Sequence, residues 1–217
     1  TAAPRGGDRV YTVVLTGGPC GGKSSALDVI SERLTAKGVD VLTAPETPTI
    51  IMNSGARYPG IDGGERLMVF ETALLQLQLQ LEASLSAIAK STGRPTVLVL
   101  DRALFDPKAY MPNPVWEAVL LRQGWTEADL YKRYDLVVHL VTAADGAEKV
   151  SAGKCAVAVS NNSVRSETAE QAKRKDGEVL KAWRMHHNVH VIDNSTGFKA
   201  KLERALAPIL ELVESEG

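Results

Sequence analysis

Cysteine and aromatic residues are scarce in this sequence. Of its 217 residues, only Cys20 and Cys155 are cysteines, and aromatic side chains account for 5%. Two cysteines cannot form the disulfide framework of a small secreted domain, and a bridge to Cys20 would obstruct the glycine-rich segment in which it lies. The scarcity therefore excludes a disulfide scaffold and favours a reducing compartment, either the cytoplasm or another intracellular one.

The sequence also lacks a charge excess and a long apolar run. It has 25 basic and 26 acidic side chains, so no basic surface indicates a nucleic-acid partner. No apolar run reaches the roughly 18 residues of a transmembrane segment. A hydrophobic content of 44% suits one α/β domain with a buried core. We expect residues 1–9 to be a flexible lead-in and residues 10–217 to form a single domain.

Strand-like and helical segments alternate along the chain. Short β-rich runs predict strands at residues 10–15, 39–43, 96–100, 135–141 and 190–192. Helical spacing predicts helices at residues 24–37, 65–90, 165–185 and 198–213. Leucines at alternate positions in residues 65–90 also fit a strand, but the long stretch without Gly or Pro favours a helix. Residues 44–49 are expected to turn, and residues 142–164 to form a mobile loop. This order predicts an α/β fold with a three-layer, doubly wound parallel sheet of about five strands.

The glycine-rich run after the first strand is the most informative motif. It consists of Gly17, Gly18, Pro19, Cys20, Gly21, Gly22, Lys23 and Ser24. Glycines let backbone N–H groups crowd round phosphate oxygens. We expect Lys23 to reach the β and γ phosphates, Ser24 to ligate Mg²⁺ and Ser25 to lie at the same nucleotide site. With a strand before it and a helix after it, the motif predicts that residues 10–217 are a P-loop NTPase domain of nucleoside-kinase-like topology that binds ATP or GTP.

A second ligand for Mg²⁺ is expected at the end of a neighbouring strand. Asp101 follows the apolar run at residues 96–100 and is the candidate. The alternative is a carboxylate that only caps the following turn. Arg102 would face the same crevice, where its planar guanidinium can bind phosphate oxygens.

Glu46 lies just past the second predicted strand, at the edge where open α/β sheets bind ligands. In a phosphotransferase, a carboxylate there can be the general base that accepts the proton of a hydroxyl acceptor. The alternative is a loop carboxylate that binds nearby N–H groups. Asp106 is the next carboxylate along the same edge and is the second candidate for the base.

Two further candidates lie toward the C-terminus. Arg165 begins a predicted helix and could belong to a lid, about residues 142–170, that closes over the γ-phosphate. Alternatively, Arg165 is one of several exposed helix charges that pair with acidic neighbours and have no role at the site. Asn194, Ser195 and Thr196 follow the last strand, where the base of the nucleotide could be held. Capping of the next helix by Ser195 or Thr196 is the alternative there.

Several of these runs carry a family resemblance. They are residues 13–24 (VVLTGGPCGGKS), 101–110 (DRALFDPKAY), 139–148 (HLVTAADGAE), 165–167 (RSE) and 191–196 (VIDNST). Together they resemble the P-loop family shared by NadR-type nicotinamide riboside kinases and the insect protein that translocates TRP channels. The last run and residues 142–148 place the chain closer to the TRP-translocation branch. That resemblance implies GTP binding, a phosphoinositide partner and an attached triphosphate-tunnel domain.

Two functions from different classes follow. The first is a kinase-like domain that binds ATP or GTP with Mg²⁺ and transfers the γ-phosphate to a small hydroxyl acceptor such as a nucleoside. The second is a nucleotide-binding regulatory module that hydrolyses slowly and acts in membrane trafficking or on an attached domain. Glu46 distinguishes them, because a switch needs no base for an acceptor.

Overall fold

The computed structural model describes residues 9–145 and 168–215. Its sheet has five strands in the order β2-β3-β1-β4-β5, and all four pairings are parallel. The strands are β1 (Val10–Thr16), β2 (Asp40–Ala44), β3 (Thr96–Asp101), β4 (Leu136–Leu140) and β5 (Val189–Ile192). The central strands β1, β3 and β4 are mostly apolar because both of their faces are buried. All five strands predicted from the sequence are therefore confirmed.

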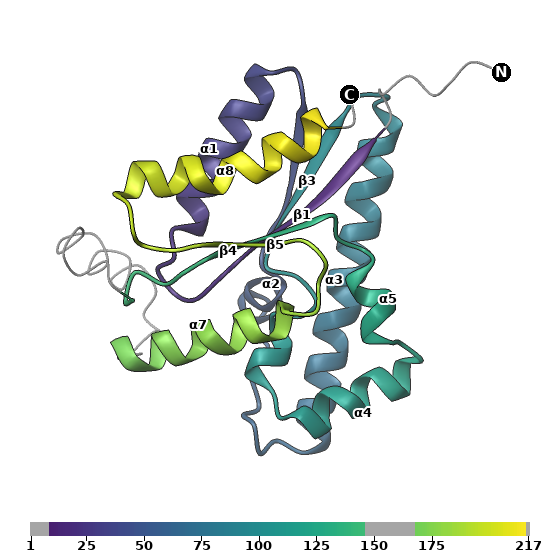
Figure 1. Cartoon of the computed structure of the whole chain (residues 1–217). Helices are drawn as coiled ribbons and strands as arrows, with labels where there is room; N and C mark the ends of the chain where they lie inside the picture. The colour runs from purple at the N-terminus through teal and green to yellow at the C-terminus, as the bar shows by residue number, and fades with distance from the viewer. Residues whose placement is uncertain (1–8, 146–167, 216–217) are drawn as a thin grey trace.

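Helices cover both faces of the sheet (Figure 1). On one face, α1 (Lys23–Ala36) and α8 (Phe198–Glu214) pack Ile30, Leu34 and Leu206 against the side chains of β1, β3 and β4. On the other face, α3 (Glu65–Ser91), α4 (Asn113–Gln123) and α5 (Glu127–Tyr131) form the second core with Leu98 and Leu100. This confirms the predicted three-layer, doubly wound α/β fold.

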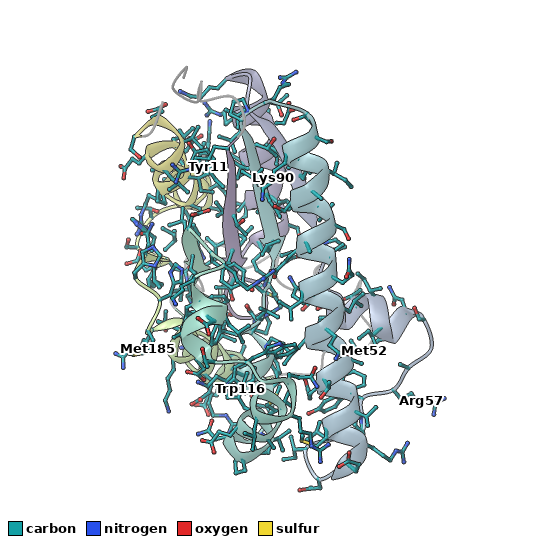
Figure 2. The ribbon with its side chains drawn as sticks, turned by 90° about the vertical axis from the view of Figure 1, so that its right-hand side faces the viewer. Tyr11, Met52, Arg57, Lys90, Trp116 and Met185 are labelled. Atoms are coloured by element: carbon teal, nitrogen blue, oxygen red, sulfur yellow. The ribbon has the colours of Figure 1, made fainter. Side chains whose placement is uncertain are left out.

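The long segment with two competing patterns is a helix, α3, which runs beside the sheet (Figure 2). Its buried face carries polar side chains as well as leucines. Glu82 accepts hydrogen bonds from Arg133 and from the Tyr134 hydroxyl, and Gln78 accepts one from Thr47. Of the alternating glutamines, Gln78 is buried in this hydrogen-bonded polar stripe, whereas Gln76 and Gln80 are exposed. The alternation of leucine and glutamine therefore does not mark a strand.

The structure corrects the expected turn at residues 44–49. A short helix, α2 (Thr47–Asn53), begins there with Glu46 at its N-cap position. Pro48 lies in the first turn, where its missing N–H costs no hydrogen bond. A proline that indicated a turn in the sequence therefore starts a helix, and Glu46 is fixed at the helix start.

Two further elements lie near the carboxyl edge of the sheet. The short 3₁₀ helix η1 (Pro107–Tyr110) follows β3, and α7 (Ala169–Trp183) precedes β5. A capping box between Thr168 and Gln171 starts α7. The predicted helix at residues 165–185 is thus found from Ala169, and its first residues, including Arg165, lie outside the described part of the chain. Most of the predicted lid and nearly all of the lead-in lie outside it as well.

Candidate functional site

The glycine-rich loop joins β1 to α1 at the carboxyl edge of the sheet. Gly22 is the N-cap residue of α1, with a φ of 96° and no side-chain cap. Within the described residues, neither the Gly21 N–H nor the Gly22 N–H donates a hydrogen bond. Open N–H groups at a helix N-terminus form a binding site for an anion such as phosphate.

The loop packs directly on the end of β4, which explains two of its glycines. A Cβ on Gly17 would lie 2.1 Å from the carbonyl oxygen of Leu140, and a Cβ on Gly21 would lie 2.5 Å from the same atom. Gly17 also has a φ of 135°, which side chains disfavour. Glycine is therefore required at both positions by the close approach of two backbones.

Lys23, the first residue of α1, lies against the loop that precedes it. Its Nζ donates a hydrogen bond of 3.3 Å to the carbonyl oxygen of Gly18. Burial and then the nearby charge of Arg102 lower its pKa to about 8, against the opposing effects of Asp101 and Glu46. The nearby carboxylates thus do not fully offset the cost of burying the protonated lysine in the unliganded protein. A bound anion would stabilise the protonated form.

Asp101 ends β3 beside Leu15 of β1. Its carboxyl group therefore lies next to the glycine-rich loop of residues 17–24, which we call the phosphate loop. Its Oδ1 is buried and has no hydrogen-bond partner among the described residues. Burial raises the pKa of Asp101, and the charge of Lys23 opposes that shift. A buried carboxylate oxygen without a partner fits the oxygen ligands that Mg²⁺ takes. The exposed Ser24 at the start of α1 offers a hydroxyl oxygen of the same kind.

Arg102 is held by two carboxylates. Its Nε lies 2.6 Å from Oε1 of Glu46, and its Nη1 lies 3.1 Å from Oδ1 of Asp106. The residue is buried with a φ of 66°, and its N–H donates to the carbonyl oxygen of Leu15. The strained backbone turns the guanidinium back toward the end of β2, where it links Glu46 to the site.

Asp106 is the hydrogen-bond centre beneath this cluster. Its carboxylate accepts hydrogen bonds from the Thr16 hydroxyl, Arg102, the Ala103 N–H and the Trp183 indole N–H. Four donors on a buried carboxylate leave it little capacity to accept a substrate proton. The geometry therefore suits a structural role for Asp106 better than the role of a proton acceptor.

The residues after β5 are tied to the protein itself. Asn194 donates to the carbonyl oxygens of Thr142 and Asp145 and accepts from Nζ of Lys201. Ser195 and Thr196 accept hydrogen bonds from Arg204. Gly197 is the N-cap of α8 and no side chain caps that helix, so the capping alternative for Ser195 and Thr196 is wrong.

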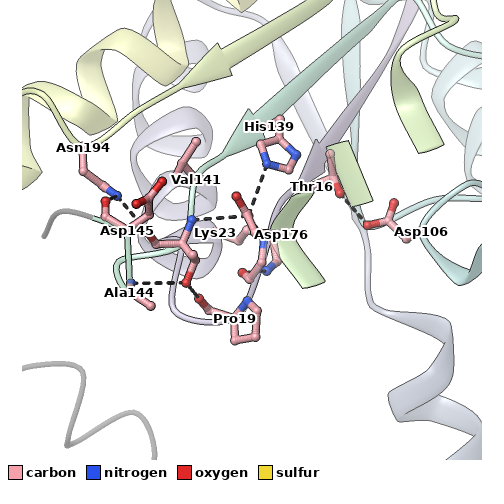
Figure 3. Close-up of polar contacts among 12 residues, drawn as sticks. Thr16, Pro19, Lys23, Asp106, His139, Val141, Ala144, Asp145, Asp176 and Asn194 are labelled. Carbon is pink, nitrogen blue, oxygen red and sulfur yellow. Dashed lines mark hydrogen bonds and ion pairs between the residues drawn. The ribbon is translucent and has the colours of Figure 1, made fainter. Parts of the chain in front are cut away.

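Other residues of the site were not among the predicted site residues, and Asp176 is one of them (Figure 3). Asp176 on α7 contacts the phosphate loop, Thr142 bonds to Pro19, and the buried Lys201 binds the carbonyl oxygen of Val141. One signal could have revealed Asp176. It shares the buried face of α7 with Ala172 and Val179, where a charged residue is unexpected.

In residues 9–145 and 168–215, no helix is both long and apolar enough to cross a membrane. No curated protein matches the chain significantly. A family profile described as an AAA domain matches residues 12–201. The match runs from β1 into α8 and includes the phosphate loop, Asp101 and Asn194. The chain therefore belongs to this AAA domain family, whose members are P-loop NTPase-like domains.

Proposed function

We propose that this domain binds ATP or GTP with Mg²⁺ and transfers the γ-phosphate to a small hydroxyl acceptor such as a nucleoside. One observation carries the proposal. The Glu46–Arg102 ion pair lies at the ends of two adjacent strands, and both charges act on the pKa of Lys23 in the phosphate loop. This pair supports the proposal because phosphotransfer needs a base beside the phosphate site.

The donor side consists of the loop residues and the start of α1. The N–H groups of Gly21 and Gly22 and the ammonium of Lys23 would bind the phosphates, and Ser25 lies in the same first turn of α1. Ser24 and Asp101 would hold Mg²⁺, which when bound neutralises charge on the transferring phosphoryl group. Asn194, Ser195 and Thr196 would position the purine or pyrimidine base of the nucleotide. Asn194 would do so indirectly, through the segment at Thr142 and Asp145 to which it donates hydrogen bonds.

The acceptor side consists of Glu46 and Arg102. The acceptor oxygen forms a bond to the γ-phosphorus, and the bond from that phosphorus to the β,γ-bridging oxygen breaks. The nucleoside diphosphate leaves, and the acceptor proton passes to the Glu46 carboxylate. Arg102 pairs with the Glu46 carboxylate and would add positive charge beside the transferring group. Arg165, outside the described residues, stays a sequence-based prediction for a lid contact.

A regulatory nucleotide-binding module is the second candidate. The observation that favours it is the engagement of both Glu46 oxygens, one by Arg102 and the other by the Thr49 hydroxyl. Such a carboxylate can simply fix the start of α2. The phosphoinositide and triphosphate-tunnel partners implied by the resemblance belong to this candidate.

Nucleotide binding is tested with a thermal-shift panel. ATP, GTP, CTP and UTP are each added with and without Mg²⁺, and the midpoint of unfolding is recorded. A ligand present at 100 times its Kd stabilises the folded state by about 2.7 kcal/mol. We expect ATP or GTP with Mg²⁺ to give the largest shift. If no triphosphate stabilises the protein at millimolar concentration, both candidate functions are wrong.

Asp101→Asn should remove the benefit of Mg²⁺ and leave metal-free binding unchanged. The substitution keeps the shape of the side chain but removes the charge that would hold the ion. Because burial raises the pKa of Asp101, its charge opposes folding, and the variant should be no less stable than wild type. Titration calorimetry with each nucleotide, with and without Mg²⁺, measures the difference. Equal losses under both conditions would assign Asp101 to the structure alone.

Nucleotide affinity should fall as the pH rises above about 8. The free protein loses the Lys23 proton near that pH, whereas a bound triphosphate favours the protonated form. Binding then takes up a proton, so Kd should rise by up to about tenfold per pH unit above the free pKa. Calorimetry between pH 7 and 9.5 measures the slope, and Lys23→Ala should lack it. A flat profile in wild type would contradict the predicted contact.

A further inference from the structure

The two halves of the phosphate loop have different hydrogen-bond partners. In the first half, the Gly18 N–H donates to Asp176, while the carbonyl oxygens of Pro19 and Cys20 accept from Thr142 and Ala143. In the second half, the N–H groups of Gly21 and Gly22 have no acceptor among the described residues. The first half is thus bound to the protein, and the second half is open to an anion.

Asp176 is the charged member of this arrangement. Its Oδ1 lies 2.5 Å from the Gly18 nitrogen and 3.3 Å from the Thr142 nitrogen, so one oxygen joins the phosphate loop to the segment after β4. The buried His139 places its Nε2 3.2 Å from the same oxygen (Figure 3). Gly18 allows this approach, because a Cβ there would lie 2.7 Å from Oδ1 of Asp176.

The neighbouring residue on α7 contacts the other side of the site. Nζ of Lys175 donates to the carbonyl oxygen of Ala109 at 2.7 Å and lies 4.2 Å from the ring centroid of Tyr110 in η1. The guanidinium of Arg102 lies 5.9 Å from the centroid of the same ring. Two consecutive residues of α7 therefore contact two parts of the site. Asp176 binds the phosphate loop, and Lys175 binds η1, whose Tyr110 ring lies beside Arg102.

We propose that Asp176 is a positioning residue that holds the first half of the phosphate loop so that its second half presents open N–H groups to the nucleotide phosphates. The inference rests on the proposed nucleotide binding. A charge-assisted hydrogen bond fixes the loop before ligand arrives, and preorganisation of this kind lowers the cost of binding. Cys20 makes the restraint important, because its φ of 56° is unfavourable for a residue with a Cβ.

The test compares Asp176→Ala and Asp176→Asn with Glu178→Ala, an exposed control two residues along the same helix. Two quantities are measured on each folded protein, namely the amide proton shift of Gly18 by NMR and the Kd for ATP and GTP with Mg²⁺. We expect Asp176→Ala to move the Gly18 signal upfield and to raise Kd about 10- to 100-fold, as for loss of a charged hydrogen bond. Asp176→Asn keeps an acceptor oxygen, so it should raise Kd only about threefold. The control should match wild type.

Each outcome decides the inference. Wild-type Kd in folded Asp176→Ala would overturn it while nucleotide binding stands, and wild type that binds neither nucleotide would overturn the proposed function and the inference together. If Asp176→Ala does not fold, Asp176→Asn carries the test, and an unchanged Kd there with a shifted Gly18 signal overturns it. A loss of affinity in Asp176→Ala with an unmoved Gly18 signal would assign Asp176 to another role and overturn it as well.

Discussion

Lys23→Ala is expected to weaken the binding of ATP and GTP with Mg²⁺ by at least about 100-fold, which corresponds to about 2.7 kcal/mol. The ammonium group is the one cation of the loop itself, and in this motif it reaches the β and γ phosphates. Charged hydrogen bonds of this kind contribute about 1.5–3 kcal/mol each. Titration calorimetry at pH 7.5 measures the loss.

The same variant should remain folded. Burial lowers the pKa of Lys23 to about 8 in the folded protein, below its value in an unfolded chain. The unfolded state therefore binds this proton more readily, and the protonated lysine opposes folding at neutral pH. We expect an unfolding midpoint equal to or above that of wild type. Lys37→Ala, beyond the other end of α1, is the matched control and should leave affinity unchanged. Undiminished affinity in folded Lys23→Ala would remove the assignment of the phosphate site.

Glu46→Gln is expected to reduce phosphotransfer by about 10²- to 10⁴-fold while the Kd for the nucleotide changes little, because a general base contributes that much to the rate. Glutamine keeps the size of the side chain and an oxygen for the Thr49 hydroxyl, but it cannot accept the acceptor proton. The assay incubates the protein with labelled ATP or GTP, Mg²⁺ and a panel of nucleosides that includes nicotinamide riboside. The phosphorylated product is separated and counted.

The outcomes separate the two candidate functions. If wild type binds a triphosphate but phosphorylates no acceptor, the regulatory module stands and the kinase is wrong. If a product forms and survives Glu46→Gln, Glu46 is not the base. Asp106 is a poor replacement, because four donors already occupy its carboxylate. Thr49→Val is the matched control, since it removes the hydroxyl that binds Glu46 and leaves the carboxylate in place.

The sequence alone determined the framework of this protein. A parallel strand buried on both faces is mostly apolar, so β1, β3 and β4 could be recognised from residues 10–15, 96–100 and 135–141. The phosphate loop could also be recognised from the sequence, because close backbone approach and open N–H groups both require glycines at fixed spacing. The position of Asp101 followed from these two features, since the end of a parallel strand lies at the binding edge.

Only the tertiary structure decided which charges meet at that edge. The Gly18–Asp176 hydrogen bond joins residues 158 positions apart, and the Thr16–Asp106 bond joins residues 90 positions apart. Neither leaves a periodic pattern, because each depends on how α7 and η1 pack against the end of the sheet. The same packing pairs Arg102 with Glu46 and commits the Asn194 side chain to Thr142, Asp145 and Lys201. Local spacing determines which groups a segment offers, and long-range packing determines which of them remain free to meet a ligand.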